Sequence, residues 1–470
     1  MQISLQICIF CAIMQVNNQR RAIYFMSTIK VDFSIQTGKV KPMHAVNNGP
    51  VYKFAVDQRI TNIDYFISAG IPYARNHDAA FFSTYGGEHT VDVHNIFKNF
   101  DADPYDPASY WFAATDEYIK VCEHAGVRTF YRLGSKIEHG VQKFGTLPPK
   151  DFKKWAIICE HIIRHYTEGW ANGFHYDIEY WEIWNEPDLS EDESDHKPCW
   201  GGTKTEFFEL YKTAATHLKK CFPHLKIGGP AVANRKGWSE DFLASLDGAP
   251  LDFFSWHRYA YNPRKIEALI RKYRELLDSN GFTETESILN EWNYVKGWTG
   301  DAWLYSLKTE KSLKGASFIT SVMCIGQRED VDMLMYYDAR PCGMNGMFST
   351  DFVCERLKGY YPFYMFGQLY KLDSAVLTEM DDENLYAVAA KSDTEAAVMF
   401  TRYNDEDIPN DTVKVDFCGF GDNGTEVEVF ILNEEHDLNT CFKATYYGEK
   451  FSVELSVPNY TSYLIKMKNL

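Results

Sequence analysis

Two glutamates in this sequence follow apolar, strand-like segments, and each is preceded by an asparagine. Glu186 lies near the end of YWEIWNEPD (180–188), where Pro187 stops a strand from continuing. Glu291 ends the segment SILNE (287–291). Two carboxyl groups that face one site are what glycosidic bond cleavage needs. One protonates the leaving oxygen, and the other is ionised to attack or stabilise the anomeric carbon.

Each glutamate has a structural alternative, which is a buried carboxylate paired with an Arg or Lys at a strand end. Two Asn-Glu pairs on separate strand ends favour the chemical interpretation over this alternative. Apolar neighbours raise a carboxyl pKa and nearby hydrogen-bond donors lower it. One site can therefore hold one protonated and one ionised carboxyl group at the same pH.

The elements that must position these glutamates alternate between strand-like and helix-like segments from about residue 40 to residue 365. Helical periodicity is clearest at residues 110–124, 152–166, 206–221 and 265–278. About eight strand-helix units in this length favour a (β/α)8 TIM barrel, an α/β fold, over an open doubly wound sheet. No Gly-rich nucleotide-binding motif follows an early strand, which also argues against the open sheet. Working residues of such a barrel lie at the C-terminal ends of its strands.

The character of the sequence changes after about residue 370. Short alternating segments separated by turn residues predict a C-terminal antiparallel β-sandwich domain. We expect a catalytic barrel over residues 40–368, a sandwich over 369–470, and a strand within 26–39 that joins the sandwich. Residues 1–25 are expected to be an N-terminal extension, because Met26 opens a segment, MSTIKVDFS, typical of a protein start. The apolar run at 5–14 is too short to span a bilayer.

The tetrapeptide WNEP at 184–187 resembles the acid/base motif of clan A retaining glycosidases, and the chain most resembles glycoside hydrolase family 39. That family includes β-xylosidases and α-L-iduronidases. The resemblance covers the barrel, the two glutamates on the expected fourth and seventh strands, and the trailing sandwich. It implies that Glu186 is the general acid/base, that Glu291 is the nucleophile, and that Asn185 donates to the sugar 2-hydroxyl. The segment NEWN at 290–293 departs from the family's commoner nucleophile wording.

The resemblance also implies supporting residues at other strand ends. His257 and Tyr259 match the sixth-strand position at which the clan orients the nucleophile. Arg75 and His77 match the second-strand position of a supporting arginine. The other residues expected to line the site are His44, Trp292, Tyr337, Asp338 and Arg340.

The substrate stays open at this stage. A β-xyloside site would be neutral, whereas a uronide site would need a cation, for which Arg340 and Arg258 are the candidates. We expect a neutral pentoside or hexoside and β-xylosidase-like action with retention, which predicts carboxyl groups about 5–5.5 Å apart. The alternatives are an α-L-arabinofuranosidase or another clan A glycosidase, and, from another class, a non-catalytic carbohydrate-binding protein.

Composition restricts the partners. The net charge of −17 argues against nucleic acid and anionic membrane as partners and is compatible with a neutral substrate. The resemblance implies that this substrate is a carbohydrate. The 11 cysteines are odd in number and irregularly spaced, which favours a reducing compartment and a cytoplasmic location. We recognise no ligand cluster with metal spacing, and therefore expect no metal and no organic cofactor. The sandwich is a candidate either to pack against the barrel or to form a homo-oligomer.

Overall fold

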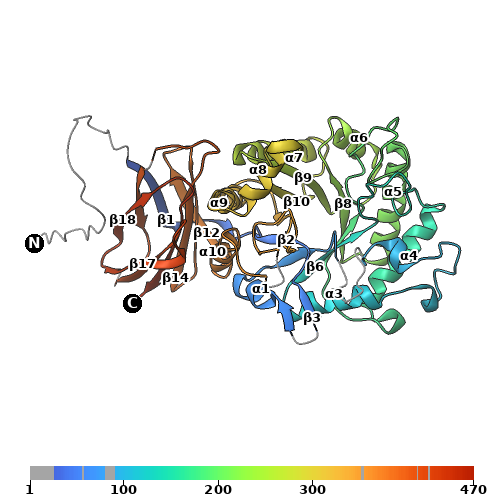
Figure 1. Ribbon diagram of the computed structural model, residues 1–470, viewed down its shortest axis with the longest axis horizontal. Helices are drawn as coiled ribbons and strands as arrows, with labels where there is room; N and C mark the ends of the chain where they lie inside the picture. Colours follow the sequence, from blue (N-terminus) through green and yellow to red (C-terminus); the bar gives the residue numbers. More distant parts are fainter. Residues whose placement is uncertain (1–25, 56–57, 80–89, 351–353, 410, 422–423) are drawn as a thin grey trace, which may run out of the picture.

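The computed structural model describes residues 26–470 apart from 56–57, 80–89, 351–353, 410 and 422–423. The expected N-terminal extension at 1–25 therefore lies outside the described residues. The described chain forms two units that lie side by side, a helix-surrounded barrel and a smaller β-sheet unit (Figure 1).

Eight parallel strands close into a barrel with the order β10-β11-β2-β5-β6-β7-β8-β9. Their bounds are β2 Ala45–Asn47, β5 Tyr73–Arg75, β6 Arg128–Leu133, β7 Tyr180–Ile183, β8 Lys226–Val232, β9 Phe253–Ala260, β10 Glu286–Tyr294 and β11 Met333–Tyr336. Spatial neighbours are also neighbours along the chain, because each parallel pair is joined by a crossover on the outside. The predicted (β/α)8 barrel is confirmed.

Helices cover the outside of this barrel and shield its apolar wall. Their bounds are α1 Ile63–Ala69, α2 Val93–Ile96, α3 Ala113–His124, α4 Phe152–Thr167, α5 Lys204–Cys221, α6 Trp238–Ser245, α7 Pro263–Ser279, α8 Gly300–Glu310, α9 Leu313–Arg328 and α10 Tyr360–Tyr370, with 3-10 turns at Pro107–Ser109 and Trp170–Asn172. Their ends follow local chemistry. Asp151 caps α4, and Thr203 with Glu206 forms a reciprocal capping box at the start of α5. A hairpin of β3 (Tyr52–Ala55) and β4 (Gln58–Thr61) precedes α1.

The second unit is one sheet of nine strands in the order β17-β16-β19-β14-β13-β12-β1-β15-β18. Their bounds are β1 Met26–Lys39, β12 Ser374–Met380, β13 Leu385–Lys391, β14 Glu395–Arg402, β15 Asp411–Cys418, β16 Thr425–Leu432, β17 Asp437–Tyr446, β18 Lys450–Val457 and β19 Ser462–Asn469. The pairs are antiparallel except β1 with β15, which is parallel. The sheet curls over its own apolar core, so that Tyr446 of β17 stacks on Phe451 of β18. This mostly antiparallel arrangement agrees with the expected sandwich.

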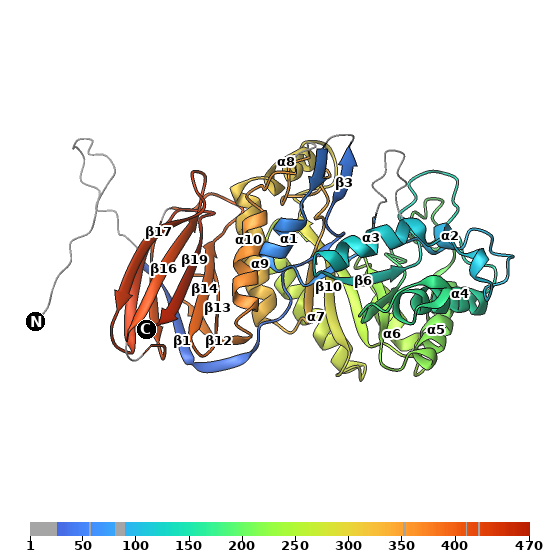
Figure 2. The same cartoon turned by 90° about the horizontal axis from the view of Figure 1, so that it is seen from below.

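Helices α9 and α10 lie between the barrel and the second sheet (Figure 2). Polar contacts also cross this boundary. Ser317 Oγ of α9 is hydrogen-bonded to Thr401 Oγ1 of β14 at 2.7 Å, and Tyr403 donates to the backbone oxygen of Tyr261 at 2.7 Å. The second unit therefore supports the barrel from the outside, and the contact with Tyr261 lies directly after the end of β9.

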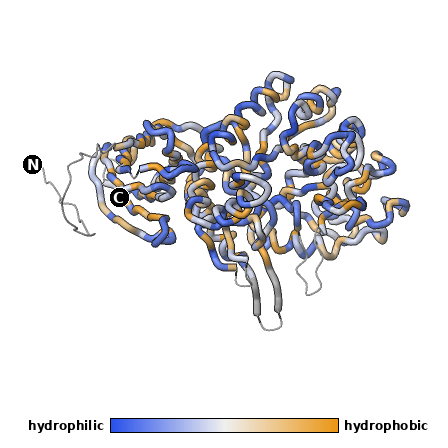
Figure 3. Tube along the Cα trace, turned by 45° about the horizontal axis from the view of Figure 1, so that its top comes forward, coloured by the Kyte–Doolittle hydropathy of each residue, from blue (hydrophilic) through white to orange (hydrophobic). Residues whose placement is uncertain are grey.

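Hydrophobic and hydrophilic residues are interspersed along the described trace of both units (Figure 3). Among the described helices, none combines the length and the apolar character that crossing a bilayer requires.

The best-defined ionic contact between the two units is centred on Asp405. Its carboxylate accepts from Tyr294 at 2.7 Å and pairs with Lys296 and Lys314 at 2.8 Å each. The Asp405 and Lys314 side chains are only 10% and 11% exposed. Removing one member of a buried pair leaves the other charge without compensation, which costs far more than losing an exposed pair.

We therefore expect Asp405→Ala to lower the free energy of unfolding by about 3 kcal/mol, because Lys314 keeps its charge in a mostly buried place. The control is Asp101→Ala, whose partner Lys150 is largely exposed, with an expected change below about 1 kcal/mol. Urea unfolding followed by tryptophan fluorescence measures both. Equal losses in the two variants would contradict the buttressing role of Asp405.

Candidate active site

Glu186 and Glu291 meet at the C-terminal end of the barrel. Glu186 follows β7, and Glu291 lies in β10. One side-chain ligand atom from each of Glu186, His257 and Glu291 lies within 4.8 Å of the other two. Carboxyl groups this close fit the separation of about 5–5.5 Å found in retaining glycosidases, rather than the about 6.5–9.5 Å that leaves room for water in inverting ones.

The backbone that presents Glu186 is strained. Glu186 has a φ of 46° and Trp184 a φ of 80°, both in the left-handed region that non-glycine residues avoid. Neighbouring groups hold this conformation. The Glu186 N–H donates to the backbone oxygen of Ala231 in β8 at 2.9 Å, and Trp184 Nε1 donates to the backbone oxygen of Cys199 at 2.8 Å. The Trp184 ring also packs edge-on against Trp200 at 5.1 Å.

Glu291 is surrounded by hydrogen-bond donors. The Tyr259 hydroxyl donates to its Oε1 at 2.5 Å, and an Arg75 Nη lies 3.4 Å from its Oε2. His257 Nδ1 lies 3.5 Å from the same Oε2. Donors and a fixed positive charge stabilise the ionised form of a carboxyl group. This environment suits a carboxylate that must stay charged.

Glu186 has fewer and weaker partners. His257 Nδ1 lies 2.9 Å from its Oε1, and the Cys199 thiol donates to its Oε2 at 3.9 Å. Burial lowers the pKa of His257 to about 4, so the imidazole is neutral near pH 7 and adds no positive charge beside Glu186. The Glu186 side chain is 10% exposed and that of Glu291 is 8% exposed.

Burial raises the pKa of both Glu186 and Glu291 to about 7. Two interacting acids lose their protons in two macroscopic steps that belong to the pair. The donors decide the order of these steps. Tyr259 and Arg75 face Glu291, so Glu291 ionises first and Glu186 keeps the shared proton. One protonated and one ionised carboxyl group then coexist near neutral pH.

Arg75 connects this site to the barrel strands. Its Nε donates to Glu182 Oε2 at 2.7 Å, and its Nη atoms donate to Asn47 Oδ1 at 3.0 Å and to Asn185 Oδ1 at 2.6 Å. The side chains of Arg75 and Glu182 are completely buried. Glu182 also accepts from Ser255 at 2.6 Å and from Asn290 at 2.5 Å.

Sequence reasoning missed Asn47, Glu182, Ser255 and Asn290 as supporting residues. Glu182 left a detectable signal, because it is a single carboxylate inside the otherwise apolar run YWEIW at 180–184. A charged residue in such a run means either that the segment is wrongly assigned as a strand or that the residue is the buried partner of a cation. The other three are short polar side chains whose role depends on which strands lie next to each other.

Asn185 keeps one hydrogen-bonding group free within the protein. Its Oδ1 accepts from Arg75, and since a guanidinium only donates, this contact fixes which end of the amide faces inward. Among the described residues, its buried Nδ2 has no hydrogen-bond partner. A buried amide N–H without a partner, beside the two carboxyl groups, can donate a hydrogen bond to an oxygen of a ligand.

Tyr337, Asp338 and Arg340 form a second group beside the carboxyl pair. Arg340 Nε donates to Asp338 Oδ2 at 2.7 Å, and Arg340 also pairs with Asp78 at 3.1 Å. The Tyr337 hydroxyl donates to Asp78 at 2.7 Å, and its ring lies 6.4 Å from that of Tyr259. Two carboxylates thus neutralise the Arg340 charge.

His77 lies next to this group. Its Nε2 lies 3.8 Å from Asp78 Oδ1, and its backbone oxygen accepts from Arg132 at 2.7 Å. Burial lowers the pKa of His77 well below its usual range. It is a neutral imidazole in the wall of the site.

Two expected site residues are not brought to the carboxyl pair. His44 precedes β2, which begins at Ala45 rather than near residue 40, so it lies at the opposite end of the barrel strand. Its Nε2 is hydrogen-bonded to the backbone oxygen of Gly70 at 2.9 Å, and its ring packs on Tyr370. Trp292 follows Glu291 in β10, and strand alternation turns it outward, where its buried ring packs on Tyr336. The prediction that His44 and Trp292 line the sugar site is therefore wrong.

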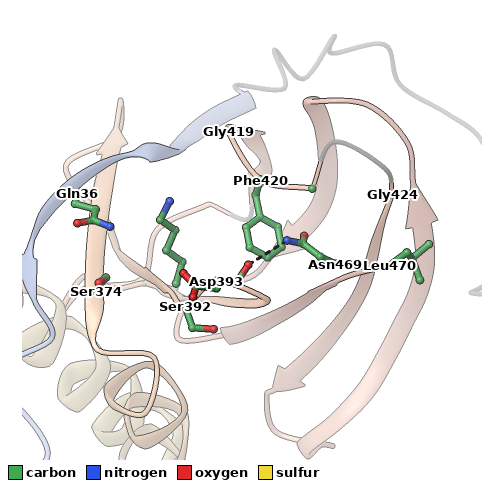
Figure 4. Close-up of a pocket in the computed structure, with 11 residues that line it drawn as sticks. Gln36, Ser374, Ser392, Asp393, Gly419, Phe420, Gly424, Asn469 and Leu470 are labelled. Carbon is green, nitrogen blue, oxygen red and sulfur yellow. Dashed lines mark hydrogen bonds between the residues drawn. The ribbon is translucent and has the colours of Figure 1, made fainter.

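A separate cavity of about 540 Å³ lies in the second sheet unit (Figure 4). Asn469 Nδ2 donates to the backbone oxygen of Asp393 inside it. Of the described residues that line this cavity, Asp393 is the only acid. The cavity therefore lacks the paired carboxyl groups of the barrel site.

Comparison with known proteins agrees with this geometry. Residues 86–285 match the family model "Glycosyl hydrolases family 39". This segment is less than half of the chain, and over it the chain is similar to glycosyl hydrolases family 39. The matched segment contains Glu186, His257 and Tyr259, whereas Glu291 lies just beyond its end. The assignment of Glu291 therefore depends on the contacts described above.

Two curated relatives match part of the chain. It is 34% identical over 180 residues to a "Beta-xylosidase" of Caldicellulosiruptor saccharolyticus, covering 36% of this chain and 34% of that protein. It is 28% identical over 194 residues to a "Beta-xylosidase" of Geobacillus stearothermophilus, covering 38% and 37%. The matched part spans only about a third of the length of these relatives.

A solved structure shares the whole fold. A glucosidase from Croceicoccus marinus superposes with a TM-score of 0.77 at 21% identity, covering 95% of this chain and 100% of that one. The chain thus shares both the barrel and the second sheet with that structure.

The raised pKa of Glu186 predicts a pH-dependent cost to stability. Its folded pKa of about 7 exceeds its ordinary value of 4.5, so the folded state loses stability as pH rises through about 7. Glu186→Gln lacks this carboxyl group and does not suffer that loss. We therefore expect the free energy of unfolding of Glu186→Gln, measured relative to wild type, to be about 2–3 kcal/mol higher at pH 8 than at pH 5.

Thermal unfolding of both proteins at the two pH values measures this difference. The control is Glu117→Gln, since Glu117 is 56% exposed on α3 and its substitution should have the same small effect at both pH values. If Glu186→Gln behaves like Glu117→Gln, the Glu186 carboxyl group is not desolvated as described.

Proposed function

We propose that this chain is a retaining glycoside hydrolase that removes terminal sugars from small glycosides or oligosaccharides, with β-xylosidase-like specificity. The observation that carries the proposal is the close approach of Glu186 and Glu291, with donors concentrated on Glu291. The names of the two curated relatives support the xylosidase specificity. Nine free cysteines among the described residues support work in a reducing compartment, the cytoplasm.

In the proposed first step, the Glu291 carboxylate attacks the anomeric carbon while Glu186 gives its proton to the glycosidic oxygen. The bond between that carbon and oxygen breaks, the alcohol leaves, and a glycosyl ester forms on Glu291. In the second step, Glu186 takes a proton from water as the water oxygen attacks the same carbon. The ester bond breaks, which restores both side chains and the original configuration.

The contacts of Glu291 serve both steps. Tyr259 and Arg75 stabilise the ionised form of Glu291 before the attack. They stabilise the same carboxylate again when the ester breaks. Ester formation removes the Glu291 charge, and the loss of a like charge lowers the pKa of Glu186. Glu186 then becomes a base at the point where the reaction needs one.

The charges around the site favour a neutral glycone. Arg340 is already paired with Asp338 and Asp78. Arg258 lies between His257 and Tyr259 in β9, so strand alternation places it on the opposite face. Arg340 is therefore already neutralised, and Arg258 faces away from the carboxyl pair, so neither arginine is placed to bind a uronic carboxylate. Trp298, which is 57% exposed and 4.9 Å from the Tyr259 ring, offers a flat apolar face at the rim for the sugar or its leaving group.

A panel of nitrophenyl glycosides tests the proposal, with β-xyloside, β-galactoside, β-glucoside, α-arabinoside and α-iduronide as substrates. We expect turnover of the β-xyloside, and we expect Glu291→Gln to lower kcat by at least about 10³-fold because no ester can form. Glu186→Gln should lose about 10²–10⁴-fold on substrates with poor leaving groups. It should lose less in the first step with nitrophenol, which needs little protonation.

The control in this assay is again Glu117→Gln, which should keep wild-type turnover. Activity that survives Glu291→Gln would overturn the nucleophile assignment. Turnover of the α-arabinoside alone would instead identify an arabinofuranosidase. No turnover on any substrate would favour a carbohydrate-binding protein with this fold.

The unpaired amide of Asn185 predicts a contact with the sugar 2-hydroxyl. We expect Asn185→Ala to lower kcat/KM by about 10²-fold, because the contact strengthens in the transition state. A 2-deoxy substrate provides the matched control. Wild type should lose a similar factor on it, whereas Asn185→Ala should hardly distinguish the two substrates. Independent, multiplying losses would mean that Asn185 acts elsewhere.

A further inference from the structure

A second cluster of ligand-type side chains lies on the outside of the barrel, between the neighbouring helices α4 and α5 (Figure 1). It consists of Glu160 of α4 with His217 and Cys221 of α5. Glu160 Oε2 lies 2.6 Å from His217 Nε2, and Cys221 Sγ lies 3.8 Å from the same nitrogen. One such atom from each residue lies within 4.8 Å of the other two. The glycosidase proposal uses none of these groups.

We propose that Glu160, His217 and Cys221 bind one transition-metal ion, for which Zn²⁺ is the best match. Carboxylate oxygen, imidazole nitrogen and thiolate sulfur are the three ligand types that Zn²⁺ takes in proteins. His217 and Cys221 are four residues apart in α5, so both project from the same helix face. Three protein ligands leave a fourth tetrahedral position for water.

One of the observed distances matches a zinc centre, and another would have to lengthen on binding. Zinc–ligand bonds of about 2.0–2.3 Å at tetrahedral angles put nitrogen and oxygen about 3.3 Å apart, and nitrogen and sulfur about 3.6 Å apart. The His217–Cys221 separation of 3.8 Å already fits. The His217–Glu160 separation of 2.6 Å is a hydrogen bond that the ion would replace. The His217 side chain is 32% exposed and that of Glu160 is 13% exposed, so both have room to move apart.

Neighbouring groups orient the proposed ligands. Arg164 Nε donates to Glu160 Oε1 at 2.8 Å, which leaves Oε2 directed at His217. Hydrogen bonds of this kind around a ligating carboxylate fix its orientation. Arg164 also pairs with Glu168, which offsets its positive charge.

The end of helix α5 adds a favourable field. Cys221 is the last residue of α5, and the unpaired carbonyl groups of a helix C-terminus carry a partial negative charge that attracts cations. Two lysines lie in the same turn: Lys219 is directed elsewhere, since it pairs with Asp252 at 2.8 Å, and Lys220 adds a positive charge next to Cys221 that partly opposes this field. Binding would displace the thiol proton of Cys221 to solvent, so that one proton is released for each ion bound. The ion would then brace α4 against α5.

The proposal departs from the expectation of no metal, which was drawn from spacing along the sequence, because its third ligand comes from another helix. Glu160 lies 57 positions away from His217 in the chain. A lone His and Cys four residues apart is a weak signal, and the packing of α4 on α5 completes the set.

Titration of the full chain with Co²⁺ tests the proposal, because a thiolate bound to cobalt gives a charge-transfer absorption in the near ultraviolet. We expect saturation of this absorption at one equivalent of Co²⁺ and its disappearance on addition of Zn²⁺. It should be lost in Cys221→Ser and kept in Cys441→Ser, the matched control, since Cys441 is an exposed cysteine outside the cluster. It should also persist in Glu186→Gln, which separates this site from the carboxyl pair of the barrel.

Two further variants keep the test valid if Cys221→Ser does not fold. Glu160→Gln and His217→Gln retain the thiol, and each should weaken binding by at least about tenfold. The melting temperature of wild type should rise with Zn²⁺, and that of Glu160→Gln should rise less at the same concentration. An absent absorption, or one that persists unchanged in Cys221→Ser or in both Gln variants, would overturn the proposal.

Discussion

The burial of one positive charge, the guanidinium of Arg75, is the constraint on which the rest of the barrel end depends. An uncompensated charge in an apolar interior is very costly, so a buried arginine needs partners for its fork of donors. Arg75 finds them on Glu182, Asn47, Asn185 and Glu291, which come from three barrel strands, β2, β7 and β10, or their ends. The same contacts that compensate the arginine charge also hold the Glu291 carboxylate and the Asn185 amide in place.

The two carboxyl groups differ by their donors rather than by their depth. Both are buried, and burial raises both pKa values, yet only Glu291 has a tyrosine hydroxyl and an arginine beside it. This asymmetry assigns the proton to Glu186. It also carries a cost, because a desolvated acid and a left-handed backbone at Glu186 both destabilise the folded state. Sites that do chemistry often show such local conflict, which the surrounding structure must offset.

Supports outside the site have a different physical character. The second sheet rests on α9 and α10 through polar pairs such as Ser317 with Thr401 and through the ion pairs of Asp405. The cluster of Glu160, His217 and Cys221 joins two helices on another side of the barrel. Both arrangements join outer helices to a neighbouring element of the fold.

The sequence by itself determined the architecture and the two central residues. Alternating segments over residues 40–368 predict the barrel, and Glu186 and Glu291 stand out because each ends an apolar run after an asparagine. Periodicity is a local property, so helices such as α4 and α5 can be read directly from it. The tertiary structure decided which polar residues share a site. Glu182 became the partner of Arg75 through closure of the barrel, and His44 was excluded because its strand starts later than expected. Strand register and closure bring together residues that are far apart in the chain, and no local pattern records which strands will be neighbours.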